Sequence, residues 1–153
     1  MDGAPDLLRQ LWEVSHALRA MSGQMERRIG ISGLQRLVLR EVAGRPGVGT
    51  SELANALALP VGTVTGIVER LVYRALLVRE PRDEPRTVRL QITPAGRHLL
   101  ETRGLTIERV VARAVADLDP ETRDAGSRLL EALGSALRDA AGPGPIPDPS
   151  DGP

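Results

Sequence analysis

The sequence contains no cysteine, no lysine and no phenylalanine, and its only aromatic residues of the Phe, Trp and Tyr type are Trp12 and Tyr73. Without cysteine the chain cannot form a disulfide, a thiolate metal site, a nucleophilic thiol or a thiol redox sensor. With so few aromatics, the core has to be built from Leu, Val, Ile and Ala, which favours packed helices over a β-sandwich. The two histidines, His16 and His98, lie far apart in sequence, so no metal site or cofactor is expected.

Long apolar segments are also missing. No run of 18 apolar residues exists, and the N-terminal segment carries acids and no apolar stretch of the signal-peptide type. We therefore expect a soluble, cytoplasmic protein without a membrane partner. At 153 residues with 41% hydrophobic content, the chain is long enough to bury one sizeable core.

The formal net charge is zero, but the charge is unevenly distributed. The stretch 36–97 holds 10 arginines against 6 acids, whereas the remainder holds 10 arginines against 14 acids. A basic middle between acidic ends indicates an anionic partner for the middle. The bias toward Arg, Ala, Gly and Pro is equally compatible with a GC-rich genome.

Apolar spacing predicts helices over 5–28 and 34–42. The first has a seam of apolar residues at alternating steps of four and three, which suits a partner chain or its own domain equally well. Ser32 and Gln35 form the capping-box pattern at the start of the second.

A helix-turn-helix followed by a hairpin is predicted next. Short helices over 50–57 and 61–74 flank a tight turn at 58–60. Two β-like stretches follow, 76–80 and 87–92, with Val88, Leu90 and Ile92 expected to face inward. The charged, proline-containing tip between them makes this hairpin a wing.

The C-terminal part is expected to be helical, apart from its end. Thr93 and Pro94 start a long helix that runs to Leu118, and Asp119 with Pro120 starts the last helix. The segment 142–153 is mostly Gly, Pro, Asp and Ser, so we expect a disordered tail.

The stretch from Ile31 to Leu100 resembles the MarR family. Its pieces are ISGLQRLVLREVA (31–43), TSELANALALPVGTVTGIVERL (50–71) and LLVREPRDEPRTVRLQITPAGRHLL (76–100), and Ile92, Thr93 and Gly96 match the family's Leu/Ile-Thr-x-x-Gly signature. The resemblance implies a mainly α fold with a small β-hairpin wing, a winged helix-turn-helix. It also implies a homodimer, with an N-terminal dimerisation helix at 5–30, a DNA-binding region at 31–93 and C-terminal dimerisation helices at 94–141.

The function implied is that of a transcriptional regulator, a repressor that binds a palindromic operator in double-stranded DNA. Thr50 and Ser51 begin a helix whose free backbone N–H groups suit a phosphate, although plain helix capping is the alternative. Thr63 and Thr65 lie on the helix that resembles the family's recognition helix, and they are expected to touch bases. Gly66 stands where the family often has a longer polar or basic side chain. We therefore expect DNA shape to contribute more to specificity than direct contacts with bases.

Four arginines are further candidates for DNA contact. Arg70 and Arg74 are placed to reach phosphates, with pairing to local acids such as Glu69 as the alternative. In the wing, Arg86 matches the family's Arg of the Asp-x-Arg motif, which enters or flanks the minor groove, and Glu69 matches the acid that pairs with it. Arg82, across the tip, is expected to share this contact.

The family commonly binds small aromatic or anionic compounds between its dimerisation and DNA-binding parts. Trp12, His16, Met21, Arg36 and Arg40 are the candidates for such a cleft, and core packing explains each equally well. No catalytic constellation is visible, so an enzyme is not expected. The alternative function is a winged-helix protein-interaction module that no longer binds DNA.

Overall fold

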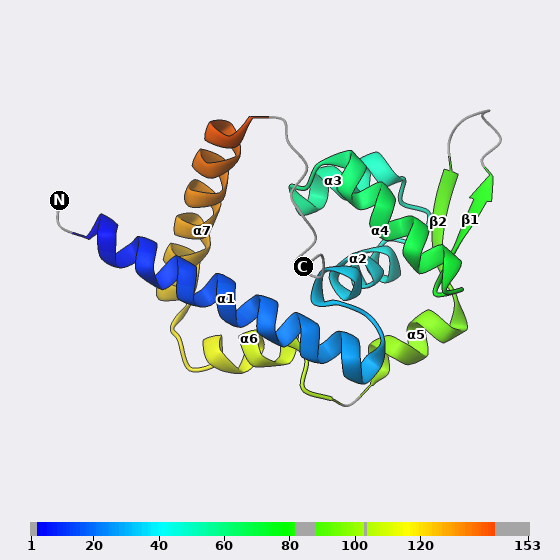
Figure 1. Ribbon diagram of the computed structural model, residues 1–153, viewed down its shortest axis with the longest axis horizontal. Helices are drawn as coiled ribbons and strands as arrows, with labels where there is room; N and C mark the ends of the chain where they lie inside the picture. Colours follow the sequence, from blue (N-terminus) through cyan, green and yellow to red (C-terminus); the bar gives the residue numbers. More distant parts are fainter. Residues whose placement is uncertain (1–2, 82–87, 103, 143–153) are drawn as a thin grey trace.

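The computed structural model describes residues 3–81, 88–102 and 104–142. The tip of the hairpin, with Arg82 and Arg86, and nearly all of the predicted disordered tail lie outside these residues. The described elements are α1 (Ala4–Ile29), α2 (Gly33–Gly44), α3 (Thr50–Leu57), α4 (Val61–Tyr73), β1 (Leu77–Pro81), β2 (Val88–Ile92), α5 (Pro94–Glu101), α6 (Ile107–Val115) and α7 (Pro120–Ala141) (Figure 1).

The turn between α1 and α2 follows its predicted signals. Gly30 ends α1 with φ of 80°, a left-handed conformation that favours glycine. At the start of α2 the Ser32 hydroxyl accepts a hydrogen bond from the Gln35 N–H, and the Gln35 side chain accepts one from the Ser32 N–H, both at 3.2 Å. The predicted capping box is therefore confirmed.

The hairpin is antiparallel and is extended by a third backbone segment. Leu77 pairs with Ile92 at its base and Pro81 with Val88 at its outer end. On the other side of β2, Leu90 exchanges backbone hydrogen bonds with Gly47 and Val48, at 2.9 and 3.1 Å. Leu90 and Ile92 are buried as predicted, but Val88 is exposed because it lies beyond the core, toward the tip.

The junction between the hairpin and α5 explains the Thr-x-x-Gly spacing. The Thr93 hydroxyl accepts from the Gly96 N–H at 3.0 Å and donates to the carbonyl oxygen of Ala75 at 2.8 Å. A Cβ on Gly96 would overlap the Leu76 carbonyl oxygen. Thr93 thus caps α5, and the absence of a side chain at Gly96 lets α5 approach the start of the hairpin.

The prediction of one long helix from Pro94 to Leu118 was wrong. The helix ends at Glu101, and α6 begins at Ile107. Thr106 caps α6 through its side chain, which accepts from the Arg109 N–H at 3.4 Å. The carbonyl oxygens of Leu99 and Leu100, near the end of α5, accept hydrogen bonds from the buried Arg36 instead of from a continued helix.

Two regions result, which we call the winged lobe (Ile31 to Glu101) and the flanking helices (α1, α6 and α7). The main hydrophobic cluster lies in the winged lobe, where α2, α3, α4 and the base of the hairpin bury Val38, Leu39, Leu53, Ile67, Leu71, Leu77 and Leu90, among others. In contrast, α6 and α7 bury no residue, and α1 buries only Ser22 and Met25. The flanking helices diverge on the side away from the hairpin (Figure 1).

No single helix of the described residues is long and apolar enough to cross a bilayer. Only α3 and α4 taken together pass such a test by length and composition, and they are bent by 117° with respect to each other.

Candidate nucleic-acid interface

The first turns of α4 offer a surface of small residues, two of them glycines. Val61 is exposed, and an added Cβ on Gly62 or on Gly66 would meet no other atom within 4 Å. Neither glycine has a positive φ, so the backbone does not require glycine at these positions. Another molecule can therefore approach the backbone of α4 more closely here than along an ordinary helix.

The two threonines predicted to touch bases have different surroundings. The Thr65 hydroxyl donates to the Val61 carbonyl oxygen at 2.8 Å, and the residue is partly exposed. The Thr63 hydroxyl oxygen is buried and has no hydrogen-bond partner among the described residues. The two hydroxyls thus differ in access, and contact of either threonine with bases stays a prediction.

The start of α3 is capped by an acid rather than by a hydroxyl. The Gly49 N–H donates to the Glu52 carboxylate at 2.8 Å, and Gly49 itself is the N-cap residue. The hydroxyls of Thr50 and Ser51 therefore do not cap the helix, which was the alternative to their predicted role. In Figure 1, α3, the start of α4 and the outer end of the hairpin lie along one edge of the winged lobe.

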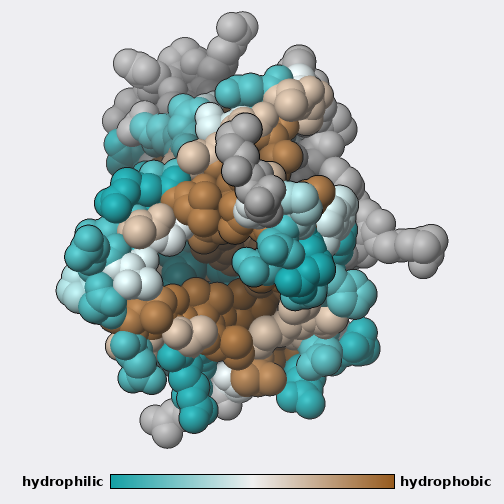
Figure 2. All heavy atoms as spheres, turned by 90° about the vertical axis from the view of Figure 1, so that its left-hand side faces the viewer, coloured by the Kyte–Doolittle hydropathy of each residue, from teal (hydrophilic) through white to brown (hydrophobic). Residues whose placement is uncertain are grey.

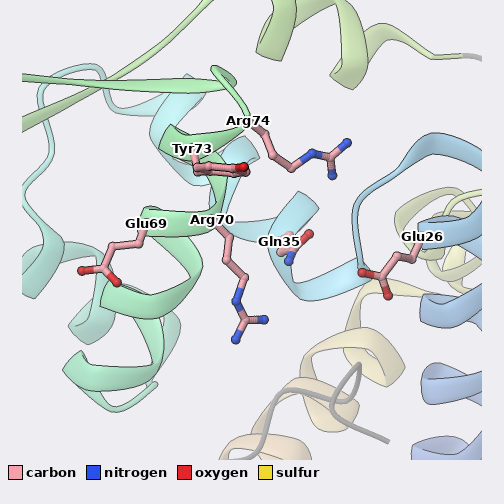
Figure 3. A pocket seen from close by; sticks show the side chains of 6 residues that line it. All are labelled: Glu26, Gln35, Glu69, Arg70, Tyr73 and Arg74. Carbon is pink, nitrogen blue, oxygen red and sulfur yellow. The ribbon is translucent and has the colours of Figure 1, made fainter.

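Arg70 and Arg74 line a different surface, an open hollow of about 570 Å³ between α1, α2 and α4. Figure 3 shows both side chains directed to this hollow, with Tyr73 between them and Glu26 opposite; Glu69 and Gln35 complete its lining. The Arg74 guanidinium lies against the turn at Gly30, where a Cβ would be 2.6 Å from its Nη2. Arg74 is thus held near α1, away from the first turns of α4.

The wing is described only up to its outer end. Arg82 and Arg86 lie outside the described residues, so the predicted pair of Glu69 with Arg86 stays a prediction; Glu69 itself is exposed. Arg79 and Arg89, on the two strands, are exposed and add positive charge next to the tip. Sequence reasoning did not name these two as candidates, although the alternation of β2 already placed Arg89 on its outer face.

The five residues predicted to line a ligand cleft are not gathered in one place. Trp12, which is 61% exposed, and His16 lie on the outer half of α1, Met21 is half-buried further along, and Arg40 is exposed on α2. Arg36 is buried between α2, α5 and α6, where it bonds to protein groups. None of the five lines the hollow beside Arg70, so the predicted cleft stays a prediction.

Comparison with solved structures identifies the architecture. A MepR-like protein complexed with pseudoligands superposes with a TM-score of 0.72 at 17% identity, covering 90% of this chain and 97% of that one. The PcaV transcriptional regulator from Streptomyces coelicolor, in complex with its natural ligand, gives 0.69 at 21% identity, covering 90% and 95%. The chain has the MarR fold.

MepR of S. aureus, solved as a complex with DNA, shares this fold with a TM-score of 0.69 at 19% identity, covering 84% of this chain and 94% of that one. No protein-family model and no curated protein matches the chain by sequence. The MarR fold therefore extends over nearly the whole chain, flanking helices included, while few of the residues are shared. The predicted fold class, a winged helix-turn-helix with a small hairpin, is confirmed.

Proposed function

We propose that the chain is a DNA-binding transcriptional regulator of the MarR family, a repressor that acts as a homodimer on a palindromic operator. The observation that carries the proposal is the likeness, over 84% of the chain, to MepR in its complex with DNA. The open first turns of α4 and the hairpin with its exposed arginines, on one edge of the winged lobe, agree with that role.

The chemistry of this surface favours contact with methyl groups and close approach over recognition by long side chains. Thr65 offers a methyl group that suits the thymine methyl, and Gly62 and Gly66 leave room for the groove edge. Arginine is the side chain that most often recognises guanine, and none stands in the first turns of α4. We therefore expect weak guanine selection under α4 and a larger contribution from DNA shape.

The flanking helices support the proposal of a homodimer. Their exposed hydrophobic residues, together with Leu118 in the turn between α6 and α7, are Leu7, Leu8, Trp12, Val14, Leu18, Val110, Val111, Leu129, Leu130 and Leu137. Figure 2, which views the molecule from the side of α1 and α7, shows hydrophobic atoms that line a hollow on this face. An exposed apolar surface of this extent marks an interaction site, and a second copy of the chain is the proposed partner.

Control by a small molecule is the finer part of the proposal. PcaV is solved with its natural ligand, and the hollow lined by Arg70, Tyr73 and Arg74 offers this chain two guanidinium groups and an exposed aromatic ring. An aromatic or anionic compound suits such a lining. Binding there would act on α4 directly, because four of the lining residues belong to its last turns or cap it.

The test starts from a library of random DNA duplexes, from which the purified protein selects its site. Fluorescence anisotropy on the selected duplex then measures affinity at several salt concentrations. Affinity should fall linearly with salt on logarithmic axes, and Arg86→Ala should reduce the slope by about 1, one phosphate contact. Arg9→Ala is the matched control, since Arg9 lies on α1 and pairs with Glu13 at 2.7 Å; its slope should equal that of the wild type.

Two outcomes would contradict the proposal. The absence of DNA binding at every salt concentration would reject DNA as the partner and favour the protein-interaction module. An equal reduction of the salt slope in Arg9→Ala and Arg86→Ala would show that DNA affinity depends on net charge and not on a contact made by the wing.

A further inference from the structure

Arg36 is a buried arginine at the point where α2, α5 and α6 meet. Its exposed fraction is 5%, and all three of its guanidinium nitrogens donate hydrogen bonds. Nη1 and Nη2 donate to the carbonyl oxygens of Leu99 and Leu100, at 2.9 and 2.8 Å, and Nε donates to the Glu108 carboxylate at 3.0 Å. One side chain of the winged lobe thus holds the end of one helix and the start of the next.

Both contacts satisfy a requirement of helix ends. The last carbonyl groups of a helix have no partner within it, and a cation is favourable there. The rigid, planar fork of arginine reaches two such carbonyls at once, which lysine cannot do. Glu108 lies in the first turn of α6, where an anion is favourable for the same reason. Arg36 therefore stabilises the break between α5 and α6 from both sides.

At the same place, the start of α2 also contacts α1 and α6. The Gly33 N–H, at the start of α2, donates to the Ser22 hydroxyl of α1 at 2.8 Å. A Cβ on Gly33 would overlap Cδ1 of Ile107, the first residue of α6. The starts of α2 and α6 thus touch without space for a side chain.

Little else fixes α6 to the lobe. The helix buries none of its residues, and the second carboxylate oxygen of Glu108 is buried without a hydrogen-bond partner among the described residues. Apart from its packing against α1, the orientation of α6, and of α7 behind it, hence depends on the few contacts made by Arg36, Glu108, Gly33 and Ile107. We call these four residues the α2–α6 junction.

We propose that the α2–α6 junction sets the angle between the winged lobe and the C-terminal helices, and that Arg36 and Glu108 are positioning residues for DNA binding. In the proposed dimer, α6 and α7 join the two copies, so the angle at each junction fixes the distance between the two α4 helices. That distance must match the spacing of two half-sites. The match between the α4 helices and the half-sites rests on the proposed function. The angle between the winged lobe and the C-terminal helices of one chain does not.

The angle can be measured within one chain. Because the sequence has no cysteine, Ala56→Cys on α3 and Arg113→Cys on α6 introduce two unique sites for spin labels, both exposed. Dilution with unlabelled protein leaves only the distance within one chain, measured by pulsed electron paramagnetic resonance. Arg36→Met and Glu108→Gln are the test variants, and Arg40→Met, exposed on the same helix, is the matched control.

We expect one narrow distance distribution in the parent and in Arg40→Met. In Arg36→Met the mean should shift by several ångströms or a second population should appear, with a smaller shift in Glu108→Gln, which keeps the shape and the two carbonyl contacts. Circular dichroism checks that each variant is folded. If Arg36→Met does not fold, the distance distribution of Glu108→Gln is the one that tests the proposal. A distribution unchanged in the folded variants overturns the proposal.

DNA binding is the second measurement. A duplex with both half-sites and a duplex with a single half-site are compared for each variant. We expect Arg36→Met to lose at least tenfold affinity for the double site and little for the single one, which a merely unstable lobe would not do. An equal loss on both duplexes overturns the positioning role. If the parent itself binds neither duplex, the proposed function fails, and the distances still decide the fixed angle.

Discussion

The winged lobe and the flanking helices use hydrophobic residues in opposite ways. In the lobe, leucines such as Leu53, Leu71 and Leu90 are fully buried against one another within a single chain. On α7, Leu129 and Leu130 are 44% and 64% exposed, and none of its 22 residues is buried. The lobe therefore has a core of its own, whereas α7 leaves its leucines uncovered in the single chain. In the proposed dimer, the second copy would cover them.

The largest expected effect on the free energy of unfolding comes from replacing a leucine with alanine, and it should differ between the two regions. Leu71→Ala should lower the free energy of unfolding by about 2–5 kcal/mol, because it leaves a cavity in a packed core. Leu130→Ala should change the stability of the monomer by only about 0.5 kcal/mol and weaken the dimer instead. Urea unfolding at two protein concentrations separates the two effects. If Leu71→Ala and Leu130→Ala lose the same free energy of unfolding at both protein concentrations, the two regions do not differ in this way.

Hydrogen exchange sharpens the same comparison at the level of the backbone. A helix without buried contacts is marginal in water, so the amides of α7 should exchange faster than those of α2 and α4 in dilute protein. Their protection should rise with protein concentration as dimers form, and Leu130→Asp should remove that rise. If α7 were as protected as α4 at every concentration, it would not depend on a partner.

Features that depend on neighbouring residues were predictable from the sequence. The capping box of Ser32 and Gln35, the left-handed Gly30 and the Thr93 cap each involve residues within four positions of one another, so their signals are local. The helix-turn-helix and the inward side chains of Leu90 and Ile92 followed from apolar spacing in the same way. These local signals were enough to give the fold class.

Features that depend on distant residues were not predictable. The break between α5 and α6 is held by Arg36, which is 63 to 72 positions away from the groups it bonds. The position of Arg74 follows from its contact with Gly30, and the burial of the Thr63 hydroxyl from packing around α4. An arginine among the apolar positions of the helix predicted over 34–42 was the one available signal for the junction.

Smaller effects on stability are expected from replacing one glycine in each region. Gly66 in α4 and Gly126 in α7 each have open space where a Cβ would stand. Replacing either with alanine should therefore raise the free energy of unfolding by about 1 kcal/mol, the helix propensity difference. Only Gly66→Ala should weaken DNA binding, since its methyl group would stand between α4 and the groove. Thermal unfolding and anisotropy measure the two effects side by side. If DNA affinity is unchanged in Gly66→Ala, close approach at this glycine is not needed.

The smallest effect is expected at the start of α7, where Asp119 is the N-cap. Hydrogen bonds from the Thr122 side chain, at 2.6 Å, and from the Thr122 backbone N–H, at 2.9 Å, lower the pKa of Asp119. A lowered pKa in the folded state means that the carboxylate stabilises the fold above its ordinary pKa, and that this contribution is lost as the pH falls through the lowered value.

Asp119→Asn tests this contribution, because asparagine caps helices as well but does not titrate. The melting temperature of the wild type minus that of Asp119→Asn should be slightly positive at neutral pH and should fall toward zero or below it in acid. Thermal unfolding over a pH series checks this, with Asp139→Asn, near the other end of α7, as the control whose difference should not follow that course. A difference for Asp119→Asn that stays constant with pH would mean that the cap acts through its shape alone. The effect is expected to be small because α7 is so loosely tied to the rest of a single chain.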